Sequence, residues 1–327
     1  MVEALAVLAN LKVITRARAE DITMVLKEGG SREDHVKLAF KILTISSLTM
    51  VIGGYTDAWW HVHVGRESFW IPPHLVIYSS LLVVLLVFTY LCFNVNMGRS
   101  KYGVIIGFLM LLSAAPIDDW WHTFNPTEVG LALMSPPHMY FAVGGAIAGL
   151  HILKIVAEQT RKYGELRKYL FIHFVAGYLM SMQAIGLIDP SNPTLLGYLG
   201  SALFAAVPAG FYIFAREAFN NRVVLVLGLS EALAKTLLES SLLYFVPLAV
   251  SALVVAKALN RAGPLSSPVV SGALVGIITG SYLLFFFDSL DPATISLRLG
   301  IAILTAALVG TLAANFADIF SRKYYRL

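Results

Sequence analysis

Long apolar runs separated by short polar breaks set the pattern of this chain. The runs are about 18–25 residues long, which is enough for a helix to cross the hydrocarbon core of a bilayer. The pattern predicts ten helical spans, at residues 36–56, 73–95, 101–118, 137–157, 168–188, 193–215, 222–238, 241–259, 267–288 and 293–318. We therefore expect an all-α, polytopic transmembrane helical bundle.

The composition agrees with a membrane protein. Hydrophobic residues make up 57% of the 327 residues and charged residues only 13%, which is too few to cover a soluble domain of this size. The seventh and eighth spans have the weakest pattern, because this part of the chain contains Glu231, Lys235 and Glu239. An even number of spans keeps both chain ends on one side, whereas nine spans would place the basic C-terminal tail outside.

The distribution of basic residues predicts the orientation of the bundle. With the N-terminus inside, only Arg66, Lys235 and Arg298 of the 24 Lys and Arg residues fall on the outer side. This bias follows the positive-inside rule, so we expect a multi-pass protein of the plasma membrane with both termini in the cytoplasm. Arg298 is expected to pair with Asp288 or Asp291. Because the basic residues lie in alternate loops, the net charge of +4 does not indicate nucleic-acid binding.

Three regions are expected along the chain. Residues 1–35 form a cytoplasmic N-terminal segment, and Glu3 and Lys12 interrupt its apolar stretch, which argues against a signal peptide. Residues 36–160 hold a four-helix region with a duplicated motif, and residues 161–327 form a six-helix membrane region. The chain has a single cysteine, so neither an intrachain disulfide nor a cysteine-rich metal site is expected.

One motif occurs twice in the four-helix region. Residues 53–80 match residues 114–143 in order and type. In each copy an expected helix ends in Asp-x-Trp-Trp-His, a short loop follows, and the next helix opens with Pro-Pro-His. The Pro-Pro pair suits the first turn of a helix, where N–H groups have no intrahelical acceptor. The first four spans are therefore predicted to be a duplicated helical hairpin, with both motifs on the outer face.

The first copy has the composition of a metal site. Asp57 and His61 lie four residues apart and share a helix face, and His74 follows after the loop. The hairpin is thus expected to bring one carboxylate and two imidazoles together. Such a set suits copper, zinc or ferrous iron and leaves a coordination position open for water, oxygen or substrate. The spacing does not choose among these metals.

The second copy repeats the set with Asp118, His122 and His138. The alternative for both sets is a polar membrane interface without metal, where tryptophans gather. All the tryptophans of the chain lie in the motif regions, and we expect them in this interfacial belt with a second role in shielding the sites. They are Trp59, Trp60, Trp70, Trp120 and Trp121. His63 is expected in the solvent-facing loop.

Two further groups of titratable residues have competing interpretations. His151 and His173 lie near the inner ends of neighbouring spans, where they are either a weaker site for haem b or ordinary core and interface histidines. Glu231, Lys235 and Glu239 recur at four-residue intervals on one helix face. This stripe predicts charge compensation within the helix, with a proton or ion path as the alternative.

The spacing Asp57-x3-His61-x12-His74 resembles that of the C subunit of the copper membrane monooxygenases, which oxidise methane, ammonia or short alkanes. The resemblance implies copper at these three residues and at the set in the second copy. It is limited to the motif region. The chain departs from the family by its six further expected spans and by the longer loop of its second copy.

Two functions are consistent with these features. The first is an integral membrane subunit of a redox complex, with two outer-face metal sites that hold copper and activate oxygen. The second is a non-catalytic anchor subunit of an archaeal-type respiratory cytochrome complex, in electron transport, with a quinone or haem contact. Both predict other membrane subunits as partners, a cytochrome among them in the second. A transporter is less favoured, because the duplication is not an inverted repeat with broken helices. Whether the chain is itself an enzyme stays open at this stage.

Overall fold

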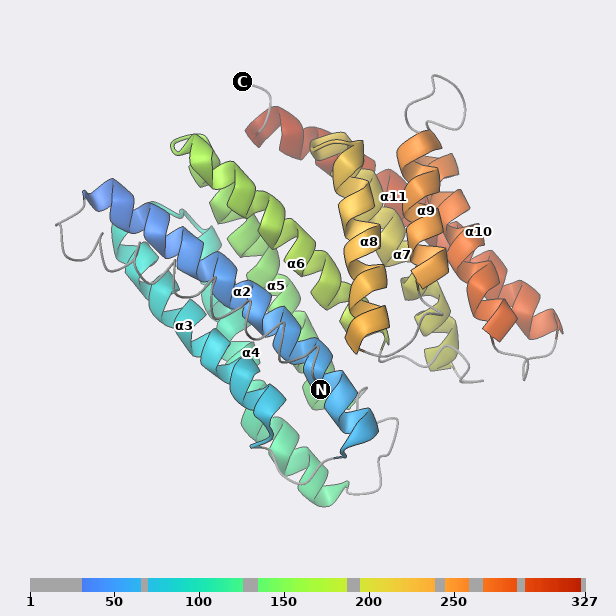
Figure 1. Ribbon diagram of the computed structural model, residues 1–327, viewed down its shortest axis with the longest axis horizontal. Helices are drawn as coiled ribbons and strands as arrows, with labels where there is room; N and C mark the ends of the chain where they lie inside the picture. Colours follow the sequence, from blue (N-terminus) through green and yellow to red (C-terminus); the bar gives the residue numbers. More distant parts are fainter. Residues whose placement is uncertain are drawn as a thin grey trace.

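The computed structural model describes residues 31–65, 70–125, 135–186, 195–238, 245–258, 267–286 and 292–324. Within these ranges the regular structure is helical, which confirms the all-α class (Figure 1). The helices are α2 (Arg32–His63), α3 (Pro72–Asn94), α4 (Ser100–Phe124), α5 (Pro136–Thr160), α6 (Arg167–Gly186), α7 (Leu195–Ala218), α8 (Asn221–Leu238), α9 (Phe245–Ala258), α10 (Pro268–Phe286) and α11 (Pro292–Tyr324), with one 3₁₀ turn, η2 (Gly164–Leu166). Each predicted range overlaps one of these long helices.

Both α2 and α4 extend beyond the ends expected from hydrophobicity. The backbone N–H of Val64 donates to Trp60 O at 2.8 Å, and that of Asn125 donates to Trp121 O at 3.0 Å. Helical hydrogen bonding therefore continues through both Trp-Trp-His segments. This confirms the prediction that each of these helices ends in Asp-x-Trp-Trp-His, beyond the end of its predicted apolar span.

The helix starts follow local sequence signals. Ser31 and Asp34 form a capping box at the start of α2, in which the Asp34 carboxylate accepts the Ser31 N–H at 3.0 Å. Both α3 and α5 open with a Pro-Pro pair in the first turn, as expected from the sequence. These prolines fix where α3 and α5 begin, and His74 and His138 are the third residues of these helices.

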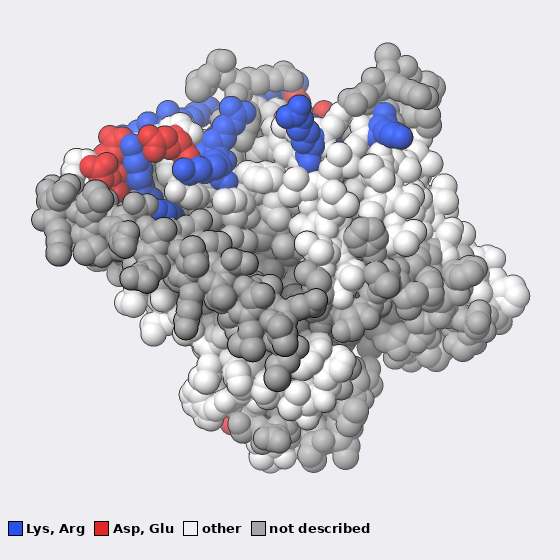
Figure 2. Space-filling view, in the orientation of Figure 1, with Lys and Arg blue, Asp and Glu red and all other residues white. Residues whose placement is uncertain are grey.

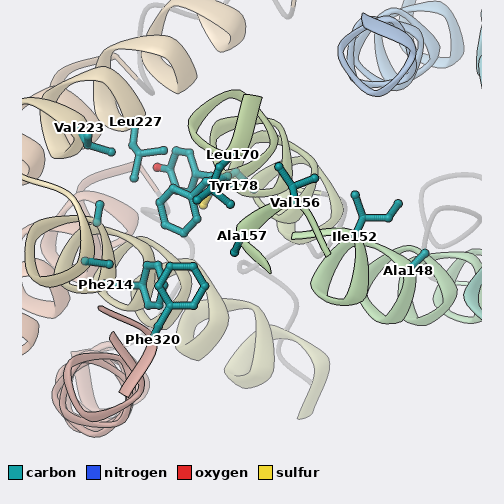
Figure 3. Close-up of a cluster of buried hydrophobic side chains, with 14 of the residues drawn as sticks. Ala148, Ile152, Val156, Ala157, Leu170, Tyr178, Phe214, Val223, Leu227 and Phe320 are labelled. Carbon is teal, nitrogen blue, oxygen red and sulfur yellow. The ribbon is translucent and has the colours of Figure 1, made fainter. Parts of the chain in front are cut away.

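The helices alternate in direction along the bundle (Figure 1). Helix α2 packs against α3, and α4 packs against α5, so each motif copy lies in its own hairpin. Helix α6 contacts α2, α5, α7 and α8 and thus joins the hairpins to the C-terminal helices. In the core, Leu170 and Tyr178 of α6 lie between Val156 of α5 and Phe214 of α7 (Figure 3).

Glycines allow the two helices of each hairpin to approach closely. A Cβ on Gly53 of α2 would lie 2.8 Å from Ile77 Cγ1 of α3. A Cβ on Gly107 of α4 would lie 2.6 Å from the backbone nitrogen of Ala148 on α5. Both distances are shorter than van der Waals contact, so a larger residue would push the helices apart. Small residues at such contacts are typical of helix packing in membranes.

Six helices among the described residues are long and apolar enough to cross a membrane. They are Arg32–His61, Pro72–Asn94, Ser100–Trp121, Pro136–Thr160, Gly197–Ala218 and Pro292–Lys323. Two shorter apolar helices, Val246–Lys257 and Pro268–Ser281, lie in α9 and α10. These features indicate an integral membrane protein, whereas the count of ten spans stays a prediction.

Basic side chains gather at one end of the bundle. Lys and Arg lie along one edge of the surface in Figure 2, over the starts of helices such as α2 and α6. The motif residues lie at the opposite ends of these helices, where α2 is followed by α3 and α4 by α5. The segregation agrees with the charge bias of the sequence, and the assignment of the motif end to the outer face stays a prediction.

Candidate metal centre

The last two turns of α2 and the first turn of α3 build the first site. Asp57 and His61 are one turn apart on α2 and therefore project from the same side of the helix. His74 follows the Pro72-Pro73 pair on α3, directly beside them. The structure thus brings together all three residues that the sequence assigned to the first metal set.

Three ligand atoms converge at this point. Asp57 Oδ1 lies 3.1 Å from His74 Nε2 and 3.5 Å from His61 Nε2. The ligand atoms of the three residues all lie within 4.8 Å of one another, and the two imidazole centroids are 5.9 Å apart. The side chains are largely shielded, since their exposed fractions are only 16% for Asp57, 19% for His61 and 10% for His74.

These distances fit a shared metal ion. Metal bonds of about 2.1 Å at tetrahedral angles set ligand atoms about 3.4 Å apart, close to both distances from Asp57 Oδ1. This oxygen is buried, and its contacts with the imidazoles lack hydrogen-bond geometry. A buried carboxylate oxygen that faces two nitrogen atoms without such geometry is suited to a cation between them. The residues present therefore fit a metal with two nitrogen ligands and one oxygen ligand.

The rings next to the first site differ in whether they contact it. Tyr78 meets the His74 ring edge-on, with centroids 6.3 Å apart. His63 faces away from the triad: its ring stacks on Trp59 at 4.8 Å, and its Nδ1 lies 2.9 Å from the Trp59 carbonyl oxygen. It is exposed, as expected, but it is the last residue of α2 rather than part of the loop.

The tryptophans divide into two groups. Trp59, Trp70 and Trp120 are exposed, the second of them by 70%, whereas Trp60 and Trp121 are half-buried. Exposed indole rings at the motif end of the bundle agree with the interfacial belt expected from the sequence. The half-buried pair lies on the same helical turns as the proposed ligands, and its expected role in shielding the sites stays a prediction.

The second copy has a different geometry. Asp118 Oδ1 lies 3.3 Å from His138 Nδ1, so the ring presents its other nitrogen to the carboxylate. The same Nδ1 lies 2.8 Å from Ser135 Oγ. The side chain of His122, the third residue assigned to this set, lies outside the described part of the structure. The structure thus brings Asp118 and His138 together and leaves the complete second set a prediction.

The two histidines of the haem alternative lie at different helix contacts. His173 on α6 is buried, and its Nε2 lies 3.0 Å from Thr44 Oγ1 on α2. His151 on α5 packs against α4, where its imidazole lies directly over Gly103. These contacts agree with interface histidines, and a haem b at His151 and His173 stays an untested prediction.

Some residues of interest were not found from the sequence. Ser135 contacts His138. The sequence gives one sign of this contact: the second copy has Ser before its Pro-Pro-His, where the first copy has Ile71. Tyr55, two residues before Asp57, contacts Glu231 of α8, and the spacing of the motif gives no sign of this contact. The predicted charge compensation among Glu231, Lys235 and Glu239 cannot be followed further, because the Lys235 side chain and Glu239 lie outside the described part of the structure.

The predicted pairing of Arg298 also falls partly outside the description. Asp288 and Asp291, its expected partners, are not among the described residues. Arg298 itself is buried in α11, and its guanidinium carbon lies 4.6 Å from the ring centroid of Tyr198 on α7. This cation–π contact accounts for part of its stabilisation inside the bundle.

Comparison of the chain with protein-family models, with curated proteins and with solved structures finds no match in any of the three. The fold and the Asp57, His61 and His74 cluster are therefore the grounds on which a function is assigned.

Proposed function

We propose that the chain is an integral membrane subunit of a redox complex that binds copper through Asp57, His61 and His74. The observation that supports this most is the convergence of the three ligand atoms within 4.8 Å at the end of one helical hairpin. The cluster lies where α2 ends and α3 begins, whereas the basic residues gather at the start of α2, and this segregation supports an outer-face site.

The ligand chemistry favours copper. Two imidazoles and one carboxylate accept copper, zinc and ferrous iron, and Cu²⁺ has the highest intrinsic affinity of the divalent first-row metals for such sites. The resemblance of the motif to copper membrane monooxygenases favours the same metal. Bound copper would supply one-electron redox chemistry and a coordination position for oxygen or water.

The protein's own residues have three roles in this proposal. Neutral imidazoles and an ionised carboxylate are the forms that bind a metal, so Asp57 also supplies one compensating negative charge. The helical turn fixes Asp57 and His61 relative to each other, and the Pro-Pro pair of α3 fixes His74. The half-buried Trp60 restricts water around the site.

Metal analysis of the purified full chain tests the proposal. We expect about one copper ion per chain at the first site and its loss in His61→Ala, because two ligands bind far more weakly than three. The matched control is His63→Ala, which removes an imidazole two residues away that faces Trp59 instead. Copper, zinc and iron all far below stoichiometric amounts in the unmodified chain would contradict the proposal.

An absorption spectrum of the same preparation separates this function from that of a respiratory anchor subunit. The copper site predicts a preparation whose bound copper depends on His61. A haem band that disappears in His173→Ala, in a preparation without copper, would instead favour the anchor subunit with a haem contact.

A further inference from the structure

Helices α4 and α5 bring basic side chains together at one end of the second hairpin. The imidazole of His151 on α5 lies directly over Gly103 of α4, and the contacts between these two helices run in antiparallel order. Arg99 precedes Gly103 by one turn, and Lys154 follows His151 by three residues. Because the helices are antiparallel, both steps lead toward the start of α4. Arg99 and Lys154 therefore flank the contact between the two helices at the basic end of the bundle.

The charges of these side chains are not fully offset by carboxylates. Arg99 is exposed, and within the described residues neither Arg99 nor Lys101 forms an ion pair. The Lys101 ammonium lies 5.2 Å from the ring centroid of its neighbour Tyr102. Lys154 Nζ lies 3.9 Å from Glu158 Oε1, at the limit of an ion pair. The start of α4 and the adjoining part of α5 thus form a surface with excess positive charge.

A basic residue of α2 at the same end has different surroundings. Lys37 Nζ lies 2.9 Å from Glu33 Oε1 and 3.5 Å from Glu165 Oε1 of η2, so two carboxylates offset its charge. The protein itself supplies the counter-charge of Lys37. Arg99 and Lys101 instead keep their charge available to an external anion.

Both helices continue from these cations into exposed apolar stripes. On α4, Ile105 and Leu109 follow Lys101 by about one and two turns, and Leu109 is 61% exposed. On α5, Leu150 precedes Lys154 by one turn and is 64% exposed. Both helices are long and apolar enough to cross a membrane. The surface therefore joins positive charge at one end to an apolar side, which complements a lipid that has an anionic headgroup.

The start of α4 also has a hydroxyl without an acceptor. Ser100 is 1% exposed, and its Oγ is buried with no hydrogen-bond partner within the described residues. The residue before it, Arg99, makes no side-chain capping bond. Helix starts favour negative charge, since their first N–H groups have no intrahelical acceptor. Phosphate oxygens are acceptors of the kind that this helix start lacks.

We propose that the basic end of the α4–α5 hairpin binds an anionic phospholipid. Arg99, Lys101 and Lys154 contact the phosphate of the headgroup, and the acyl chains lie along the exposed stripes of the two helices. Clusters of basic residues beside membrane-spanning helices are typical of sites for anionic lipids. The lipid lies at the end of the hairpin opposite Asp118 and His138, so this inference does not rest on copper binding.

Native mass spectrometry of the full chain in detergent, titrated with phosphatidylglycerol or phosphatidylcholine, tests the proposal. We expect the first phosphatidylglycerol to bind more tightly than the first phosphatidylcholine. We expect Arg99→Gln and Lys154→Gln each to weaken phosphatidylglycerol binding about fivefold, the contribution of one basic residue near a membrane surface. Binding of phosphatidylcholine is expected to stay unchanged in both variants, which separates loss of charge from loss of fold.

The matched control is Lys37→Gln, which removes one positive charge at the same end of the bundle. We expect it to leave phosphatidylglycerol binding nearly unchanged, because Glu33 and Glu165 already offset that charge. Equal affinities for the two lipids in the unmodified chain would overturn the proposal. An equal loss in Lys37→Gln would also overturn it, since binding would then follow net charge alone. Displacement of the lipid by an equal concentration of glycerol 3-phosphate would show a site for soluble anions instead.

Discussion

The two copies of the motif share Asp-x-Trp-Trp-His and Pro-Pro-His but present the histidines of their second helices differently. In the first hairpin, Asp57 Oδ1 lies 3.1 Å from Nε2 of His74. In the second hairpin, Asp118 Oδ1 lies 3.3 Å from Nδ1 of His138. The residue before the Pro-Pro pair also differs, because the side chain of Ile71 in the first copy has no polar atom whereas Ser135 Oγ in the second lies 2.8 Å from His138 Nδ1.

This comparison shows that a repeated motif does not guarantee a repeated site. The first copy leaves both imidazoles directed at one carboxylate oxygen. In the second copy, the nitrogen that faces the carboxylate is also engaged by a hydroxyl, which a metal must displace. The two hairpins thus present a carboxylate and a histidine in different ways, and we expect the residue before the Pro-Pro pair to give them different metal affinities.

The largest expected effect comes from removing a ligand in each copy in turn. His74→Ala is expected to reduce copper affinity by about 100-fold or more at the first site. His138→Ala is expected to leave that site intact, because it changes only the second hairpin. Copper titration of both variants checks this. Equal losses in the two variants would mean that the copies form one shared site.

A smaller effect is expected from the helix contact beside the first site. Gly53→Ala places a Cβ 2.8 Å from Ile77 Cγ1 and 3.3 Å from the Ile77 nitrogen, so either the Ile77 side chain or the contact between α2 and α3 must shift. We expect a loss of about 1–3 kcal/mol in stability, as for other overpacked cores. Thermal unfolding in detergent measures it, with Gly149→Ala as the control, since a Cβ at Gly149 meets no atom within 4 Å.

The smallest effect is expected from the residue that separates the copies. Ser135→Ala removes the hydroxyl next to His138 without loss of a helix cap, because Ser135 makes no side-chain capping bond. We expect copper affinity at the second site to rise by up to about 10-fold, the scale of changes around metal ligands. The titration is done in an Asp57→Ala background, and an unchanged or weaker affinity would refute the role given to Ser135.

Helical periodicity and loop lengths were sufficient to predict the helices and the first site. Asp57 and His61 share a face because they are four residues apart. The loop between α2 and α3 is short, so the start of α3 with His74 must lie close to the end of α2. The contact between Tyr55 and Glu231 could not be predicted, because these residues lie 176 positions apart and meet only when α8 packs on α2. The apolar span at 36–56 is shorter than α2, since hydrophobicity does not mark the polar residues at either end of the helix.

Copper-edge X-ray absorption of the protein with Asp118 and His138 both replaced by alanine tests the metal site most directly. The account predicts copper with imidazole scattering from two histidines and one oxygen ligand at the first site. It further predicts that the imidazole signal disappears when His61 and His74 are also replaced. The same copper coordination in the absence of His61 and His74 would contradict the assignment.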